Sequence, residues 1–252
     1  MPLPHAPRPD DVYRLRIASE PQLAPDGRSA AVTLQTVAPG FDGYRHAIWL
    51  VPTDGSGAAR QLTLGSRHDR QPRFSPDGRL LAFLSERRVV LDPEPHSEAR
   101  EPDNREDAWQ VHLLPLDGGE ARRLTDLPRG VEAFEWSPDG SRLAVLSASR
   151  GATADEDARR RGRPARSDSG EPPPSDYRFV DRLDYMLNGK GFTYDRVPHL
   201  WLVDVATGAA SRLTDGPVAD REPAWSPDGR RIAFSSNRRR DPDLGPVGGA
   251  RR

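Results

Sequence analysis

The sequence contains no cysteine and only one lysine, Lys190, among its 252 residues. Without cysteine the chain can form no disulfide, no thiolate metal site and no cysteine nucleophile. Its formal net charge of −1 lacks the basic surplus that attracts nucleic acid or an anionic membrane. No apolar run approaches the roughly 20 residues that span a bilayer, and residues 1–11 lack the apolar core of a secretory signal. These absences predict a cytoplasmic location, no nucleic-acid or membrane partner and no cofactor.

A hairpin motif occurs four times along the chain. Its turns are Pro25-Asp26-Gly27, Pro76-Asp77-Gly78, Pro138-Asp139-Gly140 and Pro227-Asp228-Gly229. Proline fixes φ at the turn, aspartate hydrogen-bonds to nearby backbone, and glycine tolerates positive φ. The stretch after the second turn, residues 81–85, has β-favouring residues with a small alanine between larger neighbours. We therefore expect each turn to join two strands, the second of which packs on both faces.

A second signature, Leu-Thr, lies upstream of the last three turns. The intervals from Leu62 to Pro76, from Leu124 to Pro138 and from Leu213 to Pro227 are identical, 14 residues each. The intervals from each turn proline to the next signature leucine grow instead, from 37 to 48 to 75 residues. Insertions therefore accumulate in only one half of the repeat.

The growing interval contains a third strand, a turn and a fourth strand in each repeat. The expected third strands are residues 47–51, 109–114 and 199–204, and the fourth strands end at Thr63, Thr125 and Thr214. Four short antiparallel strands that recur at this period are typical of a β-propeller blade, which must pack on neighbouring blades to bury both faces. The sequence predicts an all-β fold, a partial β-propeller with three blades and half of a fourth.

The repeats also predict the boundaries of the segments. These are a lead-in with a short helix (1–18), blade 1 (19–66), blade 2 (67–129), blade 3 (130–217) with a long insertion at 149–196, the first half of blade 4 (218–238) and a tail (239–252). Since propellers close at about four to eight blades, we expect the chain to be part of a longer protein.

Both long insertions, residues 91–107 and 149–196, fall between the second and third strands of a blade, so we expect them on one face of the molecule. Residues 154–175 have the acidic, basic and proline-rich composition of a flexible loop. Residues 176–187 are rich in aromatic side chains, and we expect them to be ordered. Loops of this kind on a rigid scaffold often carry function.

Few residues qualify as chemical sites. The six histidines, His5, His46, His68, His96, His112 and His199, lack metal-ligand spacing and are expected to be structural or solvated. The acidic runs 155–157 and 241–243 lack the glycine and alternating ligands of a calcium loop. Trp109, Trp136, Trp201 and Trp225 recur at blade positions and are expected in the core between blades. The sequence thus predicts no metal site.

The motif Trp225-Ser226-Pro227-Asp228-Gly229-Arg230-Arg231-Ile232-Ala233-Phe234 and the Arg-Leu-Thr endings resemble the propeller repeats of the prolyl oligopeptidase family of serine peptidases. The branch that contains acylaminoacyl peptidases is the most similar. Residues 188–192 and 199–208, with the tail Ser236-Asn237-Arg238, also resemble that branch. TolB-type propellers carry nearly the same hairpin, the PD40 repeat, so the repeat alone leaves both families open.

The resemblance implies that catalysis belongs to a separate α/β-hydrolase domain after the propeller, with its serine in a Gly-x-Ser-x-Gly elbow. No such elbow occurs here; the nearest stretch, Gly55-Ser56-Gly57, lies in a polar turn. We expect a non-catalytic propeller that restricts access to short peptides, with a peptide substrate bound through the absent domain. In the family, propeller insertions can approach the peptidase domain, which suggests a gating segment here: Tyr177, Arg178, Phe179, Arg182 and Tyr185.

Two alternatives to this function stay open at this point. A stand-alone TolB-like propeller would bind a protein or peptide, and a truncated product would have no activity. The sequence also leaves open whether the chain forms a homo-oligomer and whether it should be counted as an enzyme.

Overall fold

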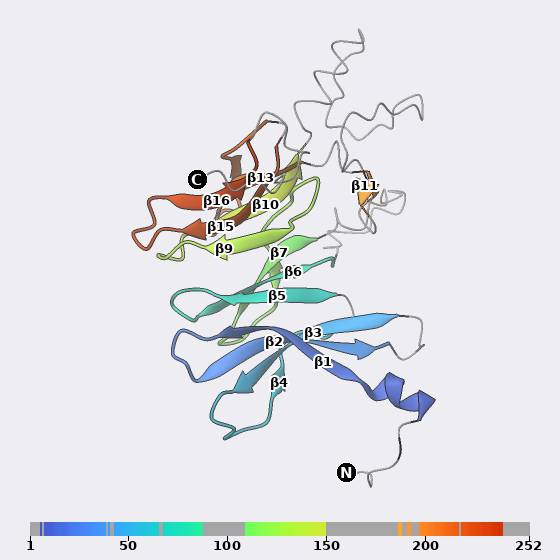
Figure 1. The fold of residues 1–252 in the computed structure, drawn as a ribbon. Coiled ribbons are helices and arrows are strands. Elements are labelled where there is room, and N and C mark those ends of the chain that lie inside the picture. Colours follow the sequence, from blue (N-terminus) through green and yellow to red (C-terminus); the bar gives the residue numbers. More distant parts are fainter. Residues whose placement is uncertain are drawn as a thin grey trace, which may run out of the picture. The chain divides into compact units, whose positions relative to one another are not determined.

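The structure, a computed structural model, describes residues 6, 8–38, 40, 43–65, 68–87, 109–149, 186–187, 191–192, 197–216 and 218–238. The chain divides into two units, Met1–Asp126 and Leu127–Arg252. Each unit is built from antiparallel sheets whose strands follow one another in chain order (Figure 1).

Unit 1 contains two four-stranded sheets. Blade 1 consists of β1 (Arg16–Leu23), β2 (Ser29–Val37), β3 (Tyr44–Pro52) and β4 (Arg60–Gln61). Blade 2 consists of β5 (Asp69–Phe74), β6 (Leu80–Ser85), β7 (Gln110–Pro115) and β8 (Arg122–Arg123). The Pro-Asp-Gly turns join the first two strands of each blade, as the sequence predicts.

Unit 2 contains one four-stranded sheet and two hairpins. Blade 3 consists of β9 (Ala133–Trp136), β10 (Arg142–Ser149), β13 (Val197–Asp204) and β14 (Ala210–Arg212). The half-blade is β15 (Asp220–Trp225) with β16 (Ile232–Ser236), and a short hairpin of β11 (Met186–Leu187) and β12 (Gly191–Phe192) lies in the insertion. Three blades and the first hairpin of a fourth confirm the predicted all-β fold.

The lead-in contains one short helix. It is a 3₁₀-helix, η1 (Pro9–Arg14), in which the Arg8 N–H donates to the Asp11 carboxylate at 2.8 Å. The first strand begins at Arg16, and residues 16–19 pair with residues 33–36 of β2.

Serine and aspartate side chains lock the turn of three hairpins. In blade 2 the Ser75 hydroxyl donates to Asp77 Oδ1 at 2.6 Å and accepts the Leu80 N–H at 2.9 Å, and the Asp77 carboxylate accepts the Arg79 N–H at 3.1 Å. Gly78 has a φ of 71°, which explains its place in the turn. Ser137 and Ser226 make the same bonds, but the first hairpin has Ala24 in this place.

The Leu-Thr signature is explained by a hydrogen bond to the third strand. The hydroxyls of Thr63, Thr125 and Thr214 accept the N–H groups of Ile48, Val111 and Leu200 at 3.0, 2.9 and 2.9 Å. The fourth strands contain only two or three residues each, so this bond extends their pairing to the third strand. The threonine of each Leu-Thr signature therefore has the same role, a hydrogen bond to one backbone N–H of the third strand.

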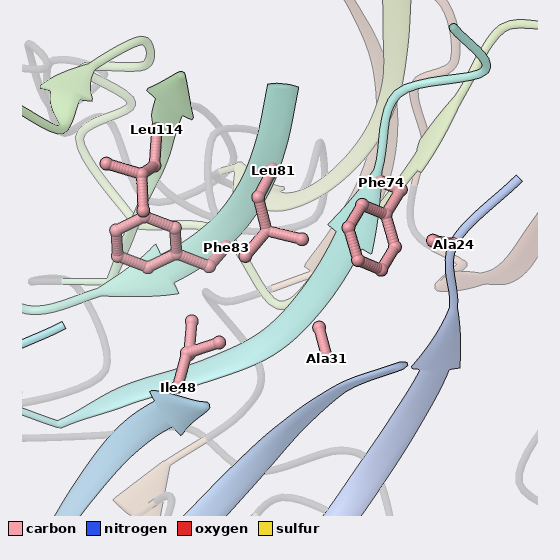
Figure 2. Close-up of a cluster of buried hydrophobic side chains, with 7 residues drawn as sticks. All are labelled: Ala24, Ala31, Ile48, Phe74, Leu81, Phe83 and Leu114. Carbon is pink, nitrogen blue, oxygen red and sulfur yellow. The ribbon is translucent and has the colours of Figure 1, made fainter. Parts of the chain in front are cut away.

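The core of unit 1 lies between its two blades. Blade 1 contributes Ala31 and Ile48, and blade 2 contributes Phe74, Leu81, Phe83 and Leu114, with Ala24 at the edge (Figure 2). In β6 every residue from Leu81 to Ser85 is buried, which confirms the prediction of a strand packed on both faces. Each sheet thus buries one apolar face only because the other sheet covers it.

Candidate functional site

The predicted gating residues Tyr177, Arg178, Phe179, Arg182 and Tyr185 all lie outside the described residues. The same holds for His5, for His96 and for the acidic runs 155–157 and 241–243. Their predicted roles therefore stay predictions.

The described residues contain no arrangement for nucleophilic catalysis. Ser56 lies in the exposed turn after β3, where its N–H donates to Asp54 Oδ1 at 2.9 Å. Within the described ranges, no serine hydroxyl hydrogen-bonds to a histidine ring, and no three side chains are placed to hold a metal ion. In the same ranges, no helix has the length and apolar character needed to cross a membrane.

A buried aspartate begins the first strand of blade 2 and of the half-blade. Asp69 Oδ2 accepts from Arg87 at 2.7 Å, and Asp220 Oδ1 accepts from Arg238 at 3.4 Å. Both carboxylates are 0% exposed, so each arginine compensates a charge that would be costly to leave alone. In each of these two hairpins, the aspartate–arginine ion pair connects the start of the first strand to the residues just after the second strand.

Burial would raise the pKa of the Asp220 carboxyl, but its hydrogen bonds hold that pKa below the usual value. The leading bond comes from the Thr214 hydroxyl, whose oxygen also accepts the Leu200 N–H. His199 Nδ1 lies 3.5 Å from the same carboxylate. Asp220 therefore joins the half-blade to blade 3 within unit 2.

The first strands of blade 1, blade 2 and the half-blade each contain a bulge, in which a glutamate or glutamine has a positive φ. Glu20, Gln71 and Glu222 have φ values of 54°, 52° and 53°, and a proline follows each one. The Glu20 carboxylate accepts the Gln71 N–H and the Thr33 hydroxyl, both at 2.7 Å. Because left-handed backbone is strained for these residues, the bond from the bulge of blade 2 to blade 1 offsets part of that cost.

His46 and His68 meet although they are 22 residues apart and belong to different blades. Their Nδ1 atoms lie 2.7 Å apart, and a parallel backbone bridge joins the same two residues. His46 Nε2 lies 3.1 Å from Gln35 Oε1, and His68 Nε2 lies 3.7 Å from Glu86 Oε1. The four side chains form a continuous row of polar groups from β2 to Glu86, the residue after β6.

The environment shifts the pKa of two histidines downward. Burial, followed by the neighbouring His68, lowers the pKa of His46. Burial lowers the pKa of His112 to about 4, because its ring stacks on Phe83 inside blade 2 and only its Nδ1 has a hydrogen-bond partner, the Gln110 carbonyl. His112 is therefore neutral at pH 7, as expected for a structural histidine.

The four tryptophans expected between blades are partly buried. Trp225 Nε1 of the half-blade donates to the Glu135 carbonyl of blade 3 at 3.3 Å. The Arg70 guanidinium lies 4.0 Å from the centre of the Trp109 ring, beside the histidine pair. Trp109 therefore borders a polar cluster of unit 1 and is not a purely apolar core residue.

The sequence reasoning missed the histidine pair and the glutamate bulge. A signal for the bulge was present, because Glu20, Gln71 and Glu222 each stand five residues before a turn proline and are each followed by proline. No comparable signal marks the histidine pair. Its two members occupy different positions of their repeats.

Comparison with curated proteins identifies peptidases. The chain is 36% identical over 229 residues to an uncharacterized peptidase, YuxL, of Bacillus subtilis; the match covers 90% of this chain and 31% of the peptidase. It is 37% identical over 108 residues to a putative tricorn protease homolog of Streptomyces coelicolor, covering 41% of this chain and 8% of that protein. No family model matches the chain. The chain therefore spans about a third of the first of these relatives.

Comparison with solved structures shows the fold. An acylaminoacyl peptidase of Pyrococcus horikoshii superposes with a TM-score of 0.60 and 16% identity, over 89% of this chain and 28% of that one. A puromycin-hydrolyzing peptidase of Mycobacterium tuberculosis gives a TM-score of 0.53 and 17% identity, over 88% and 28% of the two chains. The chain thus matches the β-propeller region of peptidases of the acylaminoacyl peptidase kind.

Proposed function

We propose that this chain is the non-catalytic propeller part of a serine peptidase and that it limits access to the active site to short peptides. The match to YuxL carries this proposal, because it spans nearly the whole of this chain but only 31% of the peptidase. A separate domain, not this chain, would then supply the nucleophile. The same match favours the peptidase over a stand-alone interaction module.

The make-up of the described residues supports a non-catalytic role. Their buried polar groups are used in joining strands and sheets: the threonine caps bond to third strands, and Asp69 and Asp220 bond to arginines. A rigid stack of sheets beside an active site would exclude folded proteins by size while extended peptides pass. Size exclusion of this kind needs shape and stability, not reactive side chains.

A domain exchange tests the proposal. The region of YuxL that aligns with this chain is replaced by this chain, and the hydrolysis of short chromogenic peptides and of a folded protein substrate is measured. The chimera should cleave the peptides and spare the folded protein, whereas YuxL without the aligned region should lose that distinction. The isolated 252-residue chain serves as control and should hydrolyse neither substrate.

Two results would contradict the proposal. Turnover of peptide by the isolated chain would show that it is catalytic. Equal selectivity in YuxL with and without the aligned region would show that the propeller does not filter substrates.

A further inference from the structure

The contact between His46 and His68 requires a proton between the two rings. Their Nδ1 atoms are 2.7 Å apart, which is a hydrogen-bond distance. Two unprotonated nitrogens at that distance would turn their lone pairs toward each other, so one of them must carry a hydrogen. The pair therefore holds one proton in the contact.

The partner of the His46 Nε2 atom determines which ring donates the hydrogen bond between the two Nδ1 atoms. Gln35 Oε1 accepts only hydrogen, so His46 Nε2, at 3.1 Å, is the protonated nitrogen of a neutral His46 ring. The His46 Nδ1 is then an acceptor, and His68 Nδ1 donates to it. His68 Nε2 lies 3.7 Å from Glu86 Oε1. Two neutral rings satisfy this arrangement, because the contact needs a hydrogen on only one of the two Nδ1 atoms.

The charges around the pair balance one proton but not two. The charged groups that act on it are Glu20 on β1, Arg70 on β5 and Glu86 after β6. Two carboxylates and one guanidinium sum to one negative charge, so one added proton on the pair would balance the site. A second proton would leave a net positive charge and would place two imidazoliums against each other.

This repulsion would act on a backbone contact between two blades. His46 lies on β3 of blade 1, and His68 lies just before β5 of blade 2, so the parallel bridge between them joins the two blades. We propose that the histidine pair is a pH-sensitive clamp of this joint: the hydrogen on one Nδ1 atom holds β3 to the start of β5, and protonation of both rings releases it. This inference is independent of the proposed peptidase role.

Hydrogen exchange tests the clamp. The exchange of the His46, Ala47, His68 and Asp69 amides is compared at about pH 7.5 and about pH 5, after correction for intrinsic rates, with amides of β10 as reference. We expect about tenfold or greater loss of protection of the joint at the lower pH, while β10 stays unchanged. In His46→Gln the pH-dependent loss of amide protection should disappear, because a single histidine cannot form two adjacent imidazoliums. The matched control, Arg45→Gln on the same strand, should keep it.

An imidazole ¹⁵N titration of the unmodified chain provides the second readout. The clamp predicts that the two rings of the pair take up their protons in two separate steps. Independent titration of the two rings, or equal acid sensitivity of the joint in His46→Gln, would overturn the proposal.

Glu86→Gln keeps the proposal testable if the histidine variant fails to fold. Removing this carboxylate leaves the pair with one positive charge too many at its first protonation, so the joint should open at a higher pH. An unchanged midpoint in Glu86→Gln would also overturn the proposal.

Discussion

The second hairpin and the fourth hairpin of this chain have nearly the same sequence but different surroundings. Both Ser75 and Ser226 bond to the aspartate of the turn, and Asp69 and Asp220 bond to an arginine after the second strand. In β6, however, Phe83 is 0% exposed, while Phe234 at the same position of β16 is 37% exposed. The hairpin is therefore formed by its own residues, and its burial is provided by neighbouring sheets.

The glutamate bulge shows the same difference. Glu20 of blade 1 bonds to Thr33 of its own blade and to the Gln71 N–H of blade 2. Glu222 of the half-blade has the same φ and bonds to Ser235, the counterpart of Thr33, at 3.4 Å. The two bulges thus have the same backbone conformation, and the Glu20 carboxylate makes an additional hydrogen bond to the neighbouring sheet.

Truncation of the two phenylalanines should give the largest contrast. Phe83→Ala removes a ring packed among buried neighbours, and we expect a loss of about 3–5 kcal/mol in the free energy of unfolding. Phe234→Ala should lose less than about 1 kcal/mol, because the ring is already partly solvated. Urea denaturation of both variants measures the difference. Equal losses would show that β16 is as well packed as β6.

Acidification should weaken unit 1 through His112, which stacks on Phe83. Its folded-state pKa of about 4 lies below the ordinary value of 6.5, so the folded state binds fewer protons than the unfolded state. The stability it contributes is complete above about pH 6.5 and is lost as the pH falls toward 4, up to about 3 kcal/mol. Denaturation midpoints of the parent chain and of His112→Leu across this range check the sign. A loss of similar size in His112→Leu would assign it to other groups.

The fold could be predicted from sequence more fully than the site. Turn chemistry is local, so Pro76, Asp77 and Gly78 predict the hairpin before any neighbour is known. The constant distance from the Leu-Thr signature to the next turn proline indicates that Thr63 has a structural role. The sequence does not reveal that role, because the partner of the Thr63 hydroxyl, the Ile48 N–H, lies on another strand. The contact of His46 with His68 depends on how two sheets pack, and no residue pattern encodes it.

The paired glutamates provide a smaller contrast. Glu20→Ala removes a carboxylate that accepts two hydrogen bonds, one of them from a backbone N–H of the next blade, and should cost about 1–3 kcal/mol. Glu222→Ala should cost less than about 0.5 kcal/mol. Both variants place alanine at the same positive φ, so backbone strain cancels in the comparison. Equal costs in thermal denaturation would mean that the intersheet bond contributes nothing.

The turn serines should show the smallest contrast. Ser75→Ala and Ser226→Ala each remove a hydroxyl that bonds within its own hairpin, and each should cost about 1 kcal/mol. Ala24→Ser, which adds this hydroxyl to the first hairpin, should stabilise by a similar or smaller amount. Urea denaturation of the three variants measures the changes. A much larger loss for Ser75→Ala than for Ser226→Ala would show that the turn depends on its neighbours.

Native-state hydrogen exchange of β6 and β16 tests most directly whether these sheets depend on neighbours for their stability. The amide of Phe83 should exchange only through global opening of unit 1, and the amide of Phe234 should exchange at least about a hundredfold faster. Equal protection of the two amides would contradict the account, because the partly exposed strand β16 would then be as stable as the buried strand β6.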